Sequence, residues 1–278
     1  MSTSILKPND AGGESVPVGH HVVVFDVHED PETLERILTS MPGMDRTSAR
    51  KLLHSLPGII PRPMSRHAAA VVASSIRRLG LNAAAIPSSE IPDLCHAEHT
   101  HHLRILDDLL EVIDIDGTQH SWPWDAVSVL SVGVVPSSAP ARHRPASTLS
   151  QGSSHRSWND GVTLPAKSRA EALFVLNAEQ PVFTFASDEM NYECLGSRMT
   201  GSSKSNFRQL IKDLMAHSPT AWVTPSARAF LDRSPVRHYE FRTRDEFRRY
   251  TEFQTLLSGR PGVGVRAAVN TSTSDRDS

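Results

Sequence analysis

The spacing of apolar positions predicts two folded regions, residues 19–92 and 93–258. The first region opens with HHVVVFDVH at 20–28, a β-branched and aromatic run of strand length. Asp30 followed by Pro31 is typical of a helix start, and apolar residues then recur every three or four positions until Gly43. We therefore expect a strand followed by a helix that ends near Gly43.

Two more helices and two more strands complete this region. Ala49, Leu52, Leu53 and Leu56 follow the i, i+3, i+4, i+7 pattern of a helix lying on a core, and Pro57-Gly58 ends it. The residues that follow predict a short strand at 59–60, a helix from a Ser65 cap to Gly80, and a strand at 81–86. The predicted order is β-α-α-β-α-β.

The spacing in residues 43–86 resembles the C-terminal domain of the bacterial ribosomal stalk protein. The positions that carry the resemblance are core and cap positions: Ala49, Arg50, Leu52, Leu53, Ser65, Ala69, Val72, Ile76, Leu79 and Gly80. The resemblance implies the fold of that small α+β domain. Asp45 and Thr47 stand where the family has a glycine and a lysine. We therefore expect this region to be an adaptor-like module and do not expect it to bind translation factors.

The second region predicts a β-rich domain closed by helices. Short strands are expected at 101–107, 109–115 and 117–122, with Asp116-Gly117 as a hairpin turn, and at 126–135, 172–177 and 181–186. Amphipathic helices are expected at 204–216 and 244–257. Strands followed by a closing helix are weakly similar to a pleckstrin-homology-like small barrel. The predicted class is α+β, with a β-rich barrel or sheet closed by C-terminal helices.

Three segments lack apolar periodicity. Residues 1–18 and 259–278 and the run at 137–157 are rich in small and polar residues, so we expect disorder there. The start of the chain has no signal-peptide pattern, and eighteen apolar residues never run together. With Cys95 and Cys194 as its only cysteines, the chain is expected in the cytoplasm.

Charge disfavours nucleic acid as a partner, because 29 basic residues balance 31 acidic ones. The sequence contains no convincing nucleophile with a base, no carboxylate pair in an apolar setting and no phosphate-binding loop. We therefore predict a protein without catalytic activity or cofactor. The interpretation is an adaptor that binds an unknown protein partner through the helical face bearing Arg46, Arg50 and Lys51.

Two alternative functions depend on residues of the second region. Thiol and imidazole side chains are concentrated in one short stretch, at Cys95, His96, His99, His101 and His102, and both are zinc ligands. No second Cys or His pair with metal-site spacing lies nearby, so a polar linker is the favoured interpretation.

The other alternative is binding of an anion or a lipid headgroup by an arginine-rich stretch. The arginines are Arg233, Arg237, Arg242, Arg244, Arg248 and Arg249, interleaved with Tyr239, Phe241, Phe247 and Tyr250. On a helix such aromatics face the core and the arginines face water, so a solvated surface is the favoured interpretation here as well.

Overall fold

The structure is a computed structural model and describes residues 19–26, 30–41, 43–113, 117–137, 168–177 and 181–259. The chain divides into two compact units, Met1–Pro92 and Asp93–Ser278. The segments expected to be disordered, 1–18, 137–157 and 259–278, lie outside the described residues except for Ser137 and Gly259. None of the helices in the described ranges is long and apolar enough to cross a membrane.

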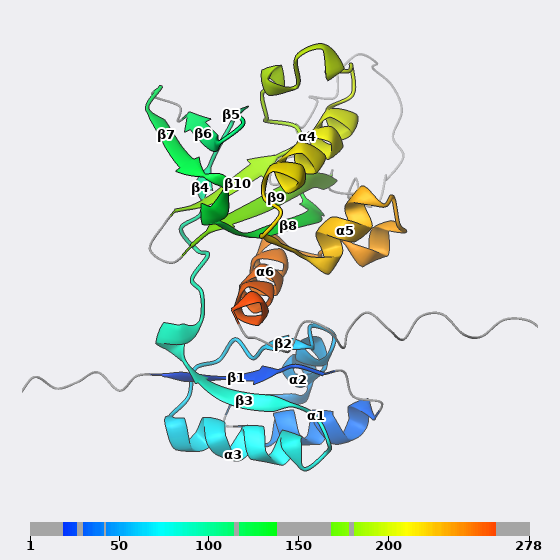
Figure 1. The fold of residues 1–278 in the computed structure, drawn as a ribbon. Coiled ribbons are helices and arrows are strands. Elements are labelled where there is room, and N and C mark those ends of the chain that lie inside the picture. The colour runs from blue at the N-terminus through cyan, green and yellow to red at the C-terminus, as the bar shows by residue number, and fades with distance from the viewer. Residues whose placement is uncertain are drawn as a thin grey trace, which may run out of the picture. The chain divides into compact units, whose positions relative to one another are not determined.

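The first unit has the predicted β-α-α-β-α-β order (Figure 1). Its elements are β1 (His20–Val24), α1 (Pro31–Thr39), α2 (Arg46–Leu53), β2 (Gly58–Ile59), α3 (Arg66–Arg77) and β3 (Ala83–Pro87). The strands form an antiparallel sheet in the order β2-β1-β3. A 3-10 turn, η1 (Ser88–Glu90), follows β3.

Local sequence explains where these helices begin and end. The Asp30 carboxylate accepts hydrogen bonds from the first-turn amides of α1, and the Ser65 hydroxyl accepts one from the amide of Ala68 in α3. Gly80 ends the last helix with φ of +82°, a conformation that favours glycine. Val22 and Val24 of β1 pack in one core with residues of all three helices, including Leu38, Leu52 and Ile76.

The second unit is built on a five-stranded sheet in the order β11-β8-β9-β10-β4. Its strands are β4 (Glu98–His99), β8 (Val127–Pro136), β9 (Ser168–Leu176), β10 (Val182–Ala186) and β11 (Trp222–Val223). The central three are antiparallel, whereas β4 runs parallel to β10 and β11 parallel to β8. A separate antiparallel sheet contains β5 (His102–Ile105), β6 (Leu109–Ile113) and β7 (Gln119–Pro123).

Helices of this unit cover both faces of the large sheet. They are α4 (Ser203–His217), α5 (Pro225–Leu231) and α6 (Arg244–Ser258), with 3-10 segments η2 (Trp124–Ala126), η3 (Glu193–Arg198) and η4 (Val236–His238). Phe174 of β9 belongs to the core cluster that holds Phe207 of α4 and Phe230 of α5. Leu173, the residue before Phe174, packs instead with Phe247 of α6. Side chains alternate between the faces of a strand, so one strand serves two helical layers.

The structure decides between the two forms predicted for the second unit and shows which residues of α6 are buried. The strands form three sheets and no closed barrel in the described part of the chain, so of the two predicted forms the sheet is the one observed. Of the two α6 aromatics expected to face the core, Phe247 is buried and Tyr250 is only partly buried. Thr251, Phe253 and Gln254 are also buried. The pattern does not predict burial of the polar Thr251, whose hydroxyl bonds to Ser131 of β8.

Candidate functional site

The predicted partner-binding residues lie on α2, which begins at an Asp45 cap. The Asp45 carboxylate accepts a hydrogen bond of 2.8 Å from the amide of Ser48. Both arginines of the predicted face reach the same carboxylate on the neighbouring helix. Arg46 Nε lies 2.6 Å from Glu35 Oε1, and Arg50 Nε lies 3.1 Å from Glu35 Oε2. The fold therefore brings Arg46 and Arg50 together around Glu35 of α1.

This ion-pair arrangement leaves the surface positively charged. The hydrogen bond from Arg46 is the main cause that lowers the pKa of Glu35, and the same bond raises the pKa of Arg46. The side chains of Arg46 and Arg50 remain 73% and 59% exposed, and Lys51 is exposed beside them. With the neighbouring Glu32, Arg36 and Asp45 included, four cations against three carboxylates leave a net charge of +1.

A groove of about 320 Å³ lies between α1 and α2, with Arg50 among its lining residues. Its apolar lining comes from both helices and the turn after α2: Pro31, Leu34, Leu53 and Leu56. Glu35, Arg50 and His54 supply its polar rim. A binding partner that inserts an apolar side chain into the groove and places a carboxylate beside Arg50 would match this surface.

The stretch 95–102 does not converge as one cluster. Cys95 lies with Asp93 and Glu252, whereas His99 and His101 lie with Glu189, and these are the two groups with metal-ligand side chains close together among the described residues. His96 and His102 belong to neither group, and His102 is part of β5. The structure therefore keeps two of the five residues of the alternative metal-site interpretation together and adds Glu189 from a distant turn.

The group around Cys95 is poorly prepared for a cation. The hydrogen bond with Asp93, followed by burial, raises the pKa of the Cys95 thiol. Burial likewise raises the pKa of Glu252, against the effect of its hydrogen bond with the Leu94 amide and of Arg248. Both shifts oppose the deprotonation that metal binding requires, whereas the hydrogen bond from the Cys95 amide lowers the pKa of Asp93.

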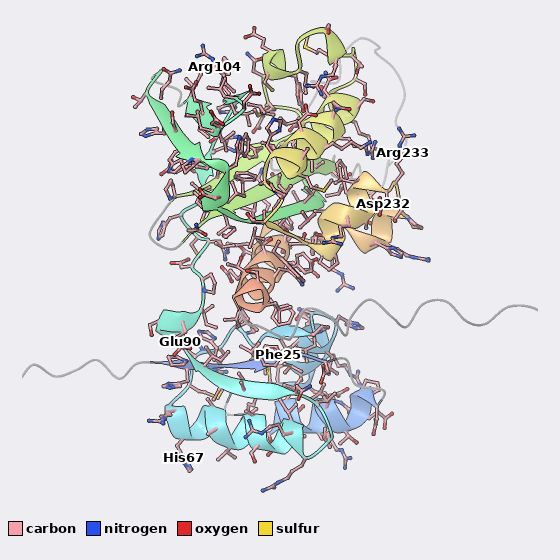
Figure 2. All side chains as sticks on the ribbon, viewed as in Figure 1. Phe25, His67, Glu90, Arg104, Asp232 and Arg233 are labelled. Atoms are coloured by element: carbon pink, nitrogen blue, oxygen red, sulfur yellow. The ribbon has the colours of Figure 1, made fainter. Side chains whose placement is uncertain are left out.

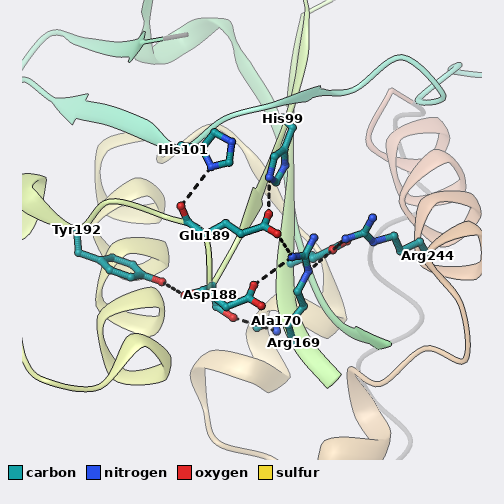
Figure 3. Close-up of polar contacts among 10 residues, drawn as sticks. His99, His101, Arg169, Ala170, Asp188, Glu189, Tyr192 and Arg244 are labelled. Atoms are coloured by element: carbon teal, nitrogen blue, oxygen red, sulfur yellow. Dashed lines mark hydrogen bonds and ion pairs between the residues drawn. The ribbon is translucent and has the colours of Figure 1, made fainter. Parts of the chain in front are cut away.

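His99 and His101 are held against Glu189 by backbone pairing (Figure 3). β4 pairs with β10, and the amide of Thr100 donates to the carbonyl of Thr184 at 2.9 Å. His99 Nε2 lies 2.6 Å from Glu189 Oε2, and His101 Nδ1 lies 3.2 Å from the carbonyl oxygen of Glu189. The two imidazole rings meet edge to face with centroids 4.6 Å apart.

Hydrogen bonds fix the turn that carries Glu189. The Tyr192 hydroxyl donates to the Ser187 carbonyl at 2.7 Å, and the amide of Ser187 donates to the carbonyl of Ala170 at 2.9 Å (Figure 3). The amide of Ala170 donates to the hydroxyl of Ser187. This network anchors the turn to β9, so the carboxylates of Asp188 and Glu189 have defined positions.

Arg169 of β9 connects these carboxylates to the sheet. Its side chain, only 8% exposed, contacts Glu171 at 2.8 Å, Asp188 at 3.2 Å and Glu189 at 2.5 Å. Arg244 of α6 contacts Glu171 from the other side at 2.5 Å. Partial burial raises the pKa of Glu189, but the bonds from Arg169 and His99 outweigh it and hold that pKa below its ordinary value.

The arginine-rich stretch is divided between paired and exposed side chains. Arg244 pairs with Glu171, and Arg248 lies 3.2 Å from Asp245 and 3.5 Å from Glu252. Arg233 is exposed after α5, where Figure 2 shows it projecting from the turn. The aromatic residues pack together instead of facing water: Tyr239 on Phe230, and Phe241 on Phe247 and Tyr250.

Sequence reasoning missed Glu189, Arg169 and Glu171. Glu189 lies ninety residues from His99 along the chain. No sequence pattern indicates that β10 pairs with β4, which is what brings the turn after β10 close to His99. A signal did exist for α5, which was also missed, because Thr224 and Pro225 form the same cap-and-proline start as Asp30 and Pro31.

Comparison of this chain with family models, with curated proteins and with solved structures found no match. The similarity to the ribosomal stalk domain and the weaker one to a pleckstrin-homology-like barrel therefore stay predictions. Functional conclusions for this chain come from its own geometry.

Proposed function

We propose that this chain is a non-catalytic adaptor whose α1–α2 groove binds an acidic, amphipathic segment of a partner protein. The observation that carries the proposal is the adjacency of an apolar groove to a positively charged surface on the same two helices. An amphipathic segment places apolar side chains in a groove and turns its charged side chains to the rim. Carboxylates on such a segment complement Arg46, Arg50 and Lys51.

Glu35 shapes the expected recognition. Its carboxylate holds the Arg50 guanidinium at the rim and pairs also with Arg46, and each guanidinium carries further N–H donors besides the Nε–H that faces Glu35. A partner carboxylate can therefore bind the outer donors without breaking the existing pairs. Charge of this kind contributes mainly to association rate and specificity, and the apolar contacts contribute most of the affinity.

The arginine-rich C-terminal stretch is a weaker choice for the binding surface. Arg244 and Arg248 are engaged with Glu171, Asp245 and Glu252, so an anion there would compete with carboxylates already in place. Around α2, Glu35 is the carboxylate that forms ion pairs with Arg46 and Arg50, and both guanidinium groups remain more than half exposed.

Selection from a displayed library of random peptides tests this proposal without assuming the partner. The full chain should enrich peptides with apolar residues at helical spacing and neighbouring Asp or Glu. Binding should fall at least tenfold in Leu53→Asp, which places a charge in the groove, and in Lys51→Glu, which reverses a charge without touching the Glu35 pairs. Arg66→Glu on α3 is the matched control and should bind as the unmodified chain does.

Enrichment of basic peptides, or equal binding by the Leu53→Asp and unmodified chains, would refute the proposed groove. Circular dichroism of each variant should show unchanged helix content, since all three positions lie outside the fully buried core.

A further inference from the structure

We propose that His99, His101 and Glu189 form a binding site for a zinc-class transition-metal ion, independent of the α1–α2 groove. One ligand atom from each of these side chains lies within 4.8 Å of the other two. Imidazole nitrogen and carboxylate oxygen are both ordinary zinc ligands. The ligands come from two segments that β4–β10 pairing brings together, His99 and His101 from one and Glu189 from the turn after the other.

The distance between His99 and Glu189 requires only a small adjustment to admit an ion, and the His101 ligand atom lies within 4.8 Å of both. Metal–ligand bonds of about 2.0–2.2 Å in a tetrahedral site place the ligand atoms about 3.3 Å from one another. His99 Nε2 and Glu189 Oε2 are 2.6 Å apart, a separation typical of two atoms sharing a proton. When the ion displaces that proton, the two atoms separate by about 0.7 Å. The side chains are 36% and 40% exposed, so torsional rotation accommodates the change.

Neighbouring groups already orient the ligands in the way that metal sites require. Arg169 binds the Oε1 atom of Glu189, which leaves Oε2 directed at His99 (Figure 3). The carbonyl oxygen of Glu189 lies 3.2 Å from His101 Nδ1 and selects the tautomer with a proton on Nδ1, so Nε2 keeps its lone pair. Outer hydrogen bonds to a carboxylate and to a histidine ring are the usual supports of a metal site.

The surrounding charge is compatible with a divalent cation. Glu171, Asp188 and Glu189 contribute three negative charges and Arg169 and Arg244 two positive ones, so these five side chains have a net charge of −1. The ligand atoms lie on the exposed side of this network, whereas the guanidinium of Arg169 is buried beneath it. Three protein ligands leave a fourth tetrahedral position for water.

Equilibrium dialysis of the full chain against Zn²⁺, after removal of metal with a chelator, tests the assignment. The expected result is one bound Zn²⁺ per chain. His101→Ala and Glu189→Gln should each weaken binding by at least the roughly 10–100-fold that loss of an outer-shell partner costs. The double variant His99→Ala/His101→Ala should remove the specific site.

Two control variants separate this site from its neighbours. His96→Ala removes an exposed histidine of the same stretch, and Cys95→Ser removes the thiol of the other group. Both should keep one Zn²⁺ at unchanged affinity. His101→Ala leaves the Arg169 ion pairs intact, so unchanged thermal unfolding in that variant shows that lost binding is not lost folding. Absence of stoichiometric Zn²⁺ from the unmodified chain, or its retention by the double variant, would overturn the assignment.

Discussion

Replacing Arg169 with methionine should destabilise the second unit substantially. The substitution removes a guanidinium that is 8% exposed and leaves the Glu171 carboxylate, itself 7% exposed, with Arg244 as its remaining ion-pair partner among the contacts described above. Breaking a buried pair by removing one partner costs about 3–5 kcal/mol, because the other charge stays buried without compensation. Arg244 compensates in part, which places the expected loss near the lower end, at about 3 kcal/mol.

The outer carboxylates add little to this number. Asp188 is 53% exposed and Glu189 is 40% exposed, so water can replace the guanidinium around them. Exposed pairs of this kind contribute about 0–1 kcal/mol each. The magnitude therefore depends on Glu171, and a double variant that also carries Glu171→Gln should recover part of the stability lost in Arg169→Met.

Urea unfolding monitored by tryptophan fluorescence measures the free energy of unfolding of the second unit. The four tryptophans, at positions 122, 124, 158 and 222, all belong to the second unit, Asp93–Ser278. With a slope of about 1–3 kcal/mol per molar urea, a loss of about 3 kcal/mol lowers the midpoint by about 1–3 M. Arg104→Met is the matched control, because Arg104 is 56% exposed and lies 3.6 Å from Glu111 (Figure 2).

The control substitution should cost less than about 1 kcal/mol. The reasoning fails if Arg169→Met costs no more than Arg104→Met, or if the added Glu171→Gln change restores no stability. Either result would mean that the Glu171 carboxylate is solvated or protonated without Arg169.

Two further predictions concern α6 and its contacts. Gly133→Ala should cost about 1–3 kcal/mol in the same urea assay, because the added Cβ would lie 2.7 Å from a ring carbon of Phe247 and 2.8 Å from Phe241; if this overpacking is the cause, Phe247→Leu in the same chain restores part of the loss. Burial raises the pKa of Glu252 in the folded protein. The stability that the protonated side chain contributes is therefore complete below the unfolded-state pKa and is lost as the pH rises through the folded-state pKa. Glu252→Gln should therefore stabilise the protein near pH 7 and lose that advantage near pH 4; an advantage independent of pH would contradict this.

Most elements of the fold could be predicted because their signals are local. Helix starts at Asp30 and Ser65 depend on a side chain bonding to amides two or three residues away, and the structure contains both bonds. The alternation in β9 likewise follows from strand geometry alone. The predicted β-α-α-β-α-β order and the α+β class needed no information about distant contacts.

Burial of polar residues could not be predicted in this way. Thr251 occupies a core position of α6 because Ser131, 120 residues earlier, offers a hydroxyl partner at 2.9 Å. A prediction based on hydropathy alone would place the short polar side chain of Thr251 on the surface. Only the packing of α6 on β8 decides which neighbour is present, and hydrogen bonding then makes the burial favourable.

The sequence by itself also determined that basic side chains gather on α2 and that ligand-type side chains gather at residues 95–102. It did not determine what these side chains meet. Glu35 joins Arg46 and Arg50 because α1 packs beside α2, and Glu189 joins His99 and His101 because β4 pairs with β10. The spacing of residues along the chain determines which side chains lie on the same face of one helix or strand. The charged or metal-binding groups opposite those side chains belong to other elements, and only tertiary packing places these elements beside them.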